Sequence, residues 1–140
     1  MNVRGQIVIA AAAVLLSAGA MAQSNVGDVM KAGGKRMTKD ELVQLHAGGV
    51  TMRGTLNNGT PYSQQNKPDG SVVGSAGNNG QFTLSGTWRI DDEGLYCHKV
   101  EARNGPSFNV CSVIWKQADK YYASAKDSAD EPVRERQFSK

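Results

Sequence analysis

The sequence predicts a mainly β fold: a small antiparallel barrel or sandwich of about six to eight short strands, preceded by one short helix. Two observations carry this prediction. Between residues 50 and 125, short apolar runs are separated by "NNGTP", "NKPDGS" and "GNNG", whose Asn-Gly and Asp-Gly pairs favour tight hairpin turns. Within this region, "QFTLSGTWRI" alternates apolar and polar side chains, as a strand with one buried face does.

One helix is predicted at the start of the β-rich region, in "MTKDELVQLHAGG". Thr38 can cap its N-terminus while Glu41, three residues later, closes a capping box. Met37 and Leu42 can pack against each other across the cap, and Gly48 is a suitable terminator. A helix of about ten residues is marginal alone, so we expect it to pack on an apolar surface.

Seven strands are predicted after the helix, each bounded by turn residues or polar segments. Period-two alternation places the apolar residues of the fourth strand on one face: Phe82, Leu84, Trp88 and Ile90. The predicted strands are residues 50–56, 62–65, 72–76, 81–90, 95–102, 108–116 and 121–125.

The segment from Gly86 to Cys111 contains both cysteines of the chain and two turns. If "DDEG" forms a four-residue turn, Ile90 faces Leu95 and Trp88 faces Cys97 across the first hairpin. All these side chains would then point to one face of the sheet. This alignment predicts an apolar row with the tryptophan beside a cysteine.

A second hairpin centred on Asn104 would pair Cys97 with Cys111, and Leu95 with Val113. Directly opposed cysteines on neighbouring strands can form a disulfide, which persists in an oxidising compartment. Closing a loop of this size should stabilise the fold by about 3 kcal/mol. The predicted structural core beside the disulfide consists of Trp88, Ile90, Leu95 and Val113.

The first 22 residues predict a signal peptide. Arg4 precedes an uncharged, mostly apolar segment at 7–20, and Ala20-Met21-Ala22 supplies the small residues of a cleavage site. A membrane anchor is the alternative, but the apolar run is at the short end of the roughly 17–25 residues that a span requires. We therefore expect a periplasmic or secreted protein with no membrane span after cleavage.

The mature chain would have 118 residues (140 minus 22), enough for one compact domain. We expect a flexible arm at 23–37, a β-rich domain with its N-terminal helix at 38–125, and a charged flexible tail at 126–140. Without Arg4 the chain has 15 basic residues (16 minus one) against 13 acidic ones, and they form no long run. Scattered charge indicates a solvated surface, so no nucleic-acid partner is expected.

The two cysteines and two histidines do not form a recognised chemical site. A redox pair is usually Cys-X-X-Cys, and His46 with Cys97, His98 and Cys111 has no zinc-site spacing. His98 should point away from its neighbour Cys97, and we expect it to be exposed. His46 lies in the last helical turn, where a cation is mildly favoured, and we expect a structural role there.

Other motifs of catalysis and ligand binding are missing from the sequence. "DDEG" lacks the alternating oxygen ligands of a calcium loop, and no serine has the Gly-X-Ser-X-Gly context. "GNNG" and "AGG" contain no phosphate-loop lysine. We therefore expect no catalytic, cofactor-binding or metal-binding residues, and no cofactor.

The order of these features resembles that of small exported bacterial proteins of the domain-of-unknown-function family 995. The shared features are a signal peptide, a "T-x-x-E-L" helix (Thr38 to Gly49), a "Pro-Asp-Gly" turn (Pro68 to Gly70), "G-T-W-R-I" with "L-Y-C" (Gly86 to Cys97), and Cys111 before a closing strand. The similarity spans roughly Thr38 to Tyr122. It implies export and a small β-rich fold with a lipocalin-like appearance, and it assigns no catalytic residue. Similar cysteine-containing strand pairs occur in small secreted lipocalin-like barrels and barrel-type protease inhibitors.

These observations favour a small exported binding module, stapled by a disulfide and not an enzyme. Its partner would be a small molecule, a glycan or an envelope protein. The alternatives are an inhibitor of an exported protease and an exported hydrolase-like enzyme with dispersed site residues. A histidine-dependent mechanism of such an enzyme would have to use His46 or His98. The candidate binding surface lies in the loops 57–60, 66–71 and 77–80. Its candidate contact residues are Tyr62, Asn66, Asp69, Tyr121 and Tyr122.

Overall fold

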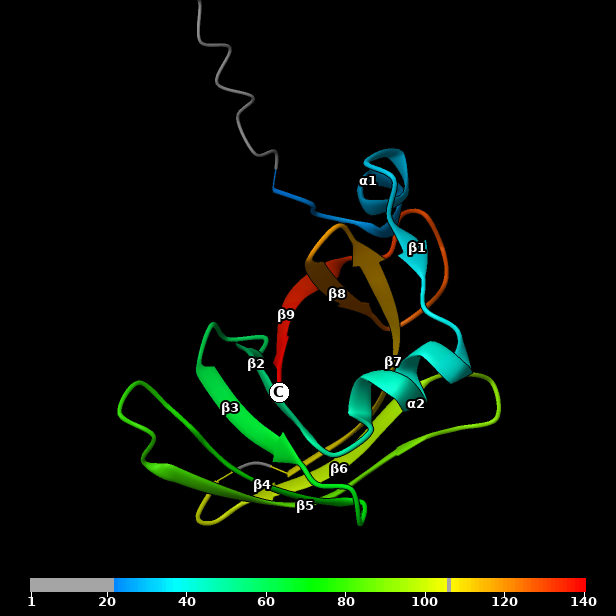
Figure 1. The fold of residues 1–140 in the computed structure, drawn as a ribbon. Helices are drawn as coiled ribbons and strands as arrows, with labels where there is room; N and C mark the ends of the chain where they lie inside the picture. The colour runs from blue at the N-terminus through cyan, green and yellow to red at the C-terminus, as the bar shows by residue number, and fades with distance from the viewer. Residues whose placement is uncertain (1–21, 106) are drawn as a thin grey trace, which may run out of the picture.

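The computed structural model of the chain describes residues 22–105 and 107–140, so the predicted signal peptide lies, apart from Ala22, outside the described residues. Two helices and nine strands are described (Figure 1). The helices are α1 (Val26–Lys31) and α2 (Lys39–His46). The strands are β1 (Lys35–Arg36), β2 (Val50–Thr55), β3 (Pro61–Asn66), β4 (Ser71–Ala76), β5 (Phe82–Ile90), β6 (Tyr96–Ala102), β7 (Ser107–Gln117), β8 (Lys120–Ser124) and β9 (Val133–Ser139).

Strands β2 to β9 form a closed antiparallel barrel, which confirms the predicted fold class and selects the barrel over the sandwich. Each strand pairs with the next one in the chain, and β9 returns to pair with β2. Closure leaves no exposed edge among these eight strands. β1 adds a short extra pairing on β7. None of the helices within 22–105 and 107–140 is long and apolar enough to span a membrane.

Alternation along each strand separates an inner from an outer face. In β5 the inward positions are more buried than the outward ones, as the sequence predicted. The largest apolar cluster fills part of the barrel interior. Its fully buried members include Leu42, Met52, Val72, Val100 and Ile114.

Helix α2 covers one end of the barrel. Its predicted capping box is confirmed: Thr38 Oγ1 accepts from the Glu41 amide, and the Thr38 amide donates to the Glu41 carboxylate at 2.7 Å. Leu42 and His46 are the buried residues of this helix. At its C-terminus, Lys140 Nζ donates hydrogen bonds to two carbonyl groups that have no partner within the helix.

The expectation of a flexible tail at 126–140 is wrong for its second half. Residues 133–139 form β9, which pairs with β8 on one side and with β2 on the other. The charge of "VRERQFS" predicts a solvated tail, but in a strand only alternate residues need to face solvent. β9 closes the barrel.

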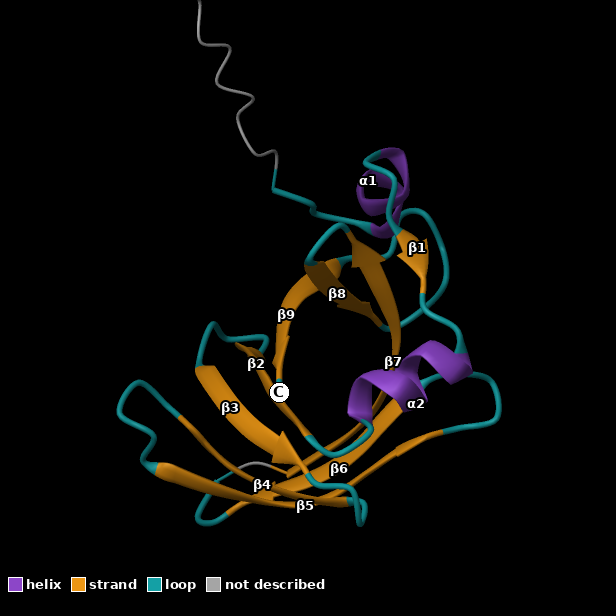
Figure 2. Cartoon of the chain, viewed as in Figure 1, coloured by secondary structure: helices purple, strands orange, loops and turns teal. Residues whose placement is uncertain are grey.

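The arm at 23–37 is also ordered. α1 and β1 lie outside the ring of strands, whereas α2 overlaps the ring in this view (Figure 2). Val26 and Val29 of α1 pack on Trp115 and Tyr122, on the outer side of β7 and β8. A second small core therefore joins the N-terminal segment to the barrel wall.

The predicted alignment of the first hairpin is wrong by one residue. Ile90 pairs with Tyr96, Arg89 with Cys97, and Trp88 with His98. The loop has three residues rather than four, because Leu95 pairs back to Asp91 and its amide donates to the Asp91 carboxylate at 2.8 Å. Gly94 at the end of this loop has φ of +75°, as three-residue hairpin loops require.

This shift divides the predicted structural core between the two faces. Trp88 and Ile90 pack against the interior cluster, whereas Leu95 and Val113 belong to the outer cluster. The second hairpin has the predicted alignment, and the disulfide between Cys97 and Cys111 is present. The disulfide therefore lies on the outer face of the wall, and Trp88 points into the barrel on the opposite face.

Candidate functional site

The barrel is hollow at the end opposite α2. A cavity of about 580 Å³ extends inward from this mouth. Its size falls within the range of small-ligand pockets, roughly 300–1,000 Å³. All eight barrel strands and two of the connecting loops contribute to its wall. The lining residues include Met52, Asn57, Tyr62, Gln64, Leu84, Tyr96, His98, Val100, Phe108, Val110, Ser112, Ile114, Ala123, Glu131, Arg134 and Arg136.

One wall of the cavity is mostly apolar. It is built by β4 to β7, whose inward positions carry Leu84, Val100, Phe108 and Val110. Val110 is 43% exposed although it faces the interior, because the cavity is open to solvent at the mouth. A surface of this kind can accept an apolar body of a ligand.

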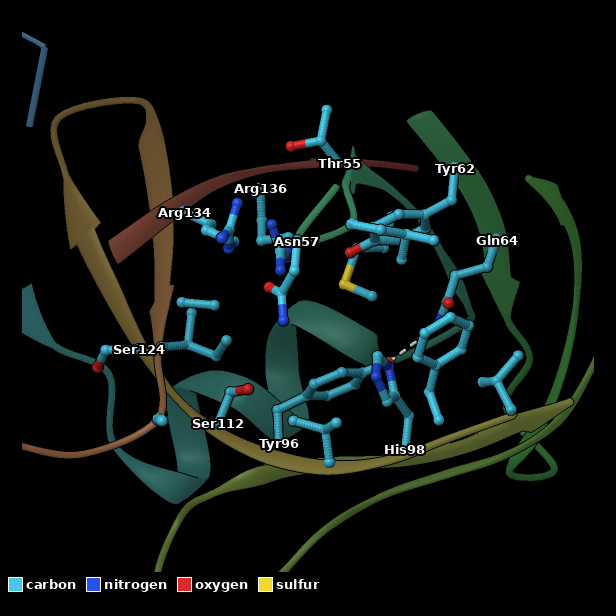
Figure 3. A pocket seen from close by; sticks show the side chains of 18 of the residues that line it. Thr55, Asn57, Tyr62, Gln64, Tyr96, His98, Ser112, Ser124, Arg134 and Arg136 are labelled. Carbon is cyan, nitrogen blue, oxygen red and sulfur yellow. Dashed lines mark hydrogen bonds between the residues drawn. The ribbon is translucent and has the colours of Figure 1, made fainter. Parts of the chain in front are cut away.

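The charged side chains of the cavity come from the opposite side. Among the described lining residues, Glu131, Arg134 and Arg136 carry charge at neutral pH. Figure 3 shows Arg134 and Arg136 on β9 across the cavity from Tyr96, His98 and Ser112. In residues 22–105 and 107–140 the ion pairs are Arg36–Asp127, Lys39–Asp92 and Lys120–Glu135, so neither β9 arginine has a carboxylate partner.

Arg136 is held inside the barrel by a specific arrangement of neighbours. Its guanidinium carbon lies 5.6 Å from the ring centre of Tyr62, and one of its nitrogens donates to the Glu135 carbonyl at 3.0 Å. Beside it, Gly54 on β2 has no side chain. A methyl group at position 54 would lie 3.0 Å from both Arg136 Nη1 and Tyr62 Oη. The glycine therefore leaves the space that the arginine and the phenol share.

A hydrogen-bonded polar group lies deeper in the interior. Gln64 donates to Asn66 at 2.9 Å and to the Tyr96 hydroxyl at 3.1 Å, and Asn66 donates to the same hydroxyl at 2.9 Å. Burial raises the pKa of Tyr96, against the effect of these hydrogen bonds. Because these groups satisfy one another, they fix the interior side chains rather than present open binding positions.

His98 is not exposed, contrary to the expectation from sequence. It sits on the inward face of β6, and its Nδ1 is buried without a hydrogen-bond partner among the described residues. Burial, and then the charge of Arg136, lower the pKa of His98 to about 4. The imidazole is therefore neutral at physiological pH.

His46 does not act as a charged group at a helix end. Its ring is 1% exposed and stacks on Trp88 and Tyr96, with ring centres 4.7 and 5.3 Å away. Nδ1 donates to the Leu42 carbonyl at 2.8 Å, and burial lowers the pKa of His46. The predicted structural role is retained, but as a neutral ring in the aromatic packing beneath the cavity.

The cysteines lie apart from this cavity. The carboxylate of Asp91 and both sulfurs are mutually within 4.8 Å on the outer side of the wall. Both sulfurs are joined in the disulfide, so no thiolate remains there to bind a metal ion or act as a nucleophile.

The five candidate contact residues do not form one surface. Only Tyr62 lines the cavity, and Asn66 is buried in the polar group just described. Asp69 is an exposed turn residue whose carboxylate accepts from Ser71. Tyr121 packs edge-on against Phe138, while Tyr122 is buried in the outer cluster.

Sequence reasoning missed Tyr96, His98, Arg134 and Arg136. A signal for the arginines was present: in "VRERQFS", Arg134, Arg136 and Phe138 occupy alternate positions and so share one face. The inward position of His98 follows from the alignment of the β5–β6 hairpin. A three-residue loop ending in Gly94, in place of the four-residue "DDEG" turn, predicts this alignment.

No family model, no curated protein and no solved structure matches the chain. The resemblance to the domain-of-unknown-function family 995 therefore stays a prediction.

Proposed function

We propose that this protein is a small exported binding module, a non-enzymatic carrier that holds a small and largely apolar ligand inside its barrel. The observation that carries the proposal is the open cavity of about 580 Å³. In a closed eight-stranded barrel, side chains can fill the interior completely or leave room for one small ligand. This interior leaves room, so a ligand in the cavity is favoured over recognition at the loops alone.

Two further features support the proposal. The N-terminal sequence has the form of a signal peptide, and a disulfide is suited to an oxidising compartment outside the cytoplasm. In the described part of the chain, the buried Nδ1 of His98 has no partner that would orient it as a catalytic base. His98 is therefore not oriented as a histidine-dependent mechanism of the enzyme alternative would require, and His46 is 1% exposed beneath the cavity.

A pair of valine substitutions tests the cavity. Val110 and Val73 are both partly exposed, at 43% and 37%, but Val110 lines the cavity and Val73 does not. Tryptophan in place of Val110 should occupy the space near the mouth. We expect Val110→Trp to weaken binding of a neutral fluorescent probe, N-phenyl-1-naphthylamine, by about tenfold or more.

Val73→Trp is the matched control, because it adds the same side chain to the outer face of β4. It should leave probe affinity unchanged, and thermal unfolding should confirm that both variants are folded. If the two folded variants bind the probe as tightly as the natural chain, the cavity is not the binding site and the proposal fails.

A further inference from the structure

Resting on the proposed carrier function, we propose that the ligand is an amphipathic carboxylate, whose acid group binds Arg136 and Arg134 while its apolar body lies along the wall of β4 to β7. The juxtaposition of two arginines with an apolar wall in one cavity carries this inference.

The first step concerns the charge of the cavity. Arg134 and Arg136 are two residues apart on β9, so their backbones are separated by about 7 Å on the same face. Within 22–105 and 107–140 neither one forms an ion pair, and Glu131 is the acidic residue among the described lining. With His98 neutral, the cavity has a net positive charge, which favours an anion.

The second step concerns the placement of Arg136. An arginine side chain turned into a barrel must occupy space that a neighbouring side chain would otherwise fill. Gly54 provides that space, since even a methyl group there would crowd both Arg136 and Tyr62. Tyr62 lies under the guanidinium and limits its movement. The fold thus positions a partly buried guanidinium that has no acidic partner among the described residues.

The third step concerns the shape of the ligand. A guanidinium binds a carboxylate through two parallel N–H donors, which favours a planar acid group. Opposite the arginines, Leu84, Val100, Phe108 and Val110 offer apolar contact. A molecule that satisfies both sides has one acid group and one apolar body. A fully polar anion would leave the apolar wall in contact with water, and a neutral hydrocarbon would leave the arginines unpaired.

The test compares three ligands that share a twelve-carbon chain: dodecanoate, dodecan-1-ol and dodecyltrimethylammonium. Each is titrated into the mature protein at neutral pH to displace N-phenyl-1-naphthylamine. We expect dodecanoate to bind about tenfold or more tightly than dodecan-1-ol, and the cation to bind least well. The advantage of dodecanoate should decrease at high salt.

Variants then test whether the tighter binding of dodecanoate arises from the arginines of the cavity. Arg136→Gln should weaken dodecanoate binding by about tenfold and leave dodecan-1-ol binding unchanged, and Arg134→Gln should act in the same direction. Arg89→Gln is the matched control, because Arg89 is exposed on the outer face of β5 and its loss changes the net charge equally. It should affect neither ligand.

The outcomes separate the two proposals. If dodecan-1-ol binds as tightly as dodecanoate, or if Arg89→Gln weakens dodecanoate as much as Arg136→Gln, the acid-group inference is overturned while the carrier function stands. If neither N-phenyl-1-naphthylamine nor any of the three twelve-carbon ligands binds, both the carrier function and the acid-group inference are overturned.

Discussion

The imidazole of His98 shows how a single side chain links the cavity to stability. In the folded protein, burial and the charge of Arg136 lower the pKa of His98 to about 4, from 6.5 for an unperturbed histidine. Below pH 6.5 the unfolded chain takes up a proton that the folded chain accepts only near pH 4. The contribution to stability is therefore complete above pH 6.5 and is lost as the pH falls toward 4.

We predict that the free energy of unfolding falls by ~3 kcal/mol between pH 7 and pH 4 through His98. Urea unfolding at a series of pH values measures this dependence. In His98→Gln the free energy of unfolding should fall by less over this pH range. Some pH dependence of the same sign should remain, because the pKa of His46 is also lowered. An equal loss in His98→Gln and in the natural chain would show that His98 is not responsible.

At the residue scale, the sequence predicted those features that depend on residues within a single helix end or a single hairpin. The capping box of Thr38 and Glu41 and the pairing of Cys97 with Cys111 are both present. The inward position of His98 was not predicted, because it depends on the length of a turn. A change of one residue in that loop moves every later side chain of β6 to the other face.

At the scale of elements, β9 is the strand that closes the barrel, because it pairs with both β2 and β8. Its residues 133–139 are charged and contain few apolar side chains, so composition predicted a flexible tail. Composition failed here because a hollow barrel can hold arginine at inward positions, where the open cavity keeps them in contact with solvent. Pairing with both β2 and β8 depends on backbone groups that composition does not describe.

Removing β9 should therefore prevent the barrel from forming. A chain that ends at Pro132 leaves β2 and β8 with unpaired edges and opens the interior to water. We expect it to lose the cooperative thermal transition and the near-ultraviolet circular dichroism of the full chain. The double variant Glu135→Ala and Gln137→Ala is the control, since it changes exposed side chains of β9 and keeps its backbone pairing.

A cooperative transition in the shortened chain, at the temperature of the full chain, would contradict the role assigned to β9. It would support the flexible tail that composition predicted.

At the scale of the molecule, the outer and inner faces of the closed barrel have different roles. The outer face carries the disulfide and the small core beneath α1. The inner face carries the aromatic packing around His46 at one end and the open cavity at the other. Alternation in the sequence predicted that two faces exist, but the hollow space is a property of all eight strands together and has no signature in any one of them.

Methyl nuclear magnetic resonance of the protein, titrated with dodecanoate and with dodecan-1-ol, tests the central claim that this hollow space holds a ligand. Inward methyl groups of Val100, Val110 and Ile114 should shift on addition of either ligand, while those of the exposed residues Val43 and Val73 should not. The claim would be contradicted if only the methyl groups of the exposed valines shifted. It would also be contradicted if no methyl group shifted when each ligand was added up to its solubility limit.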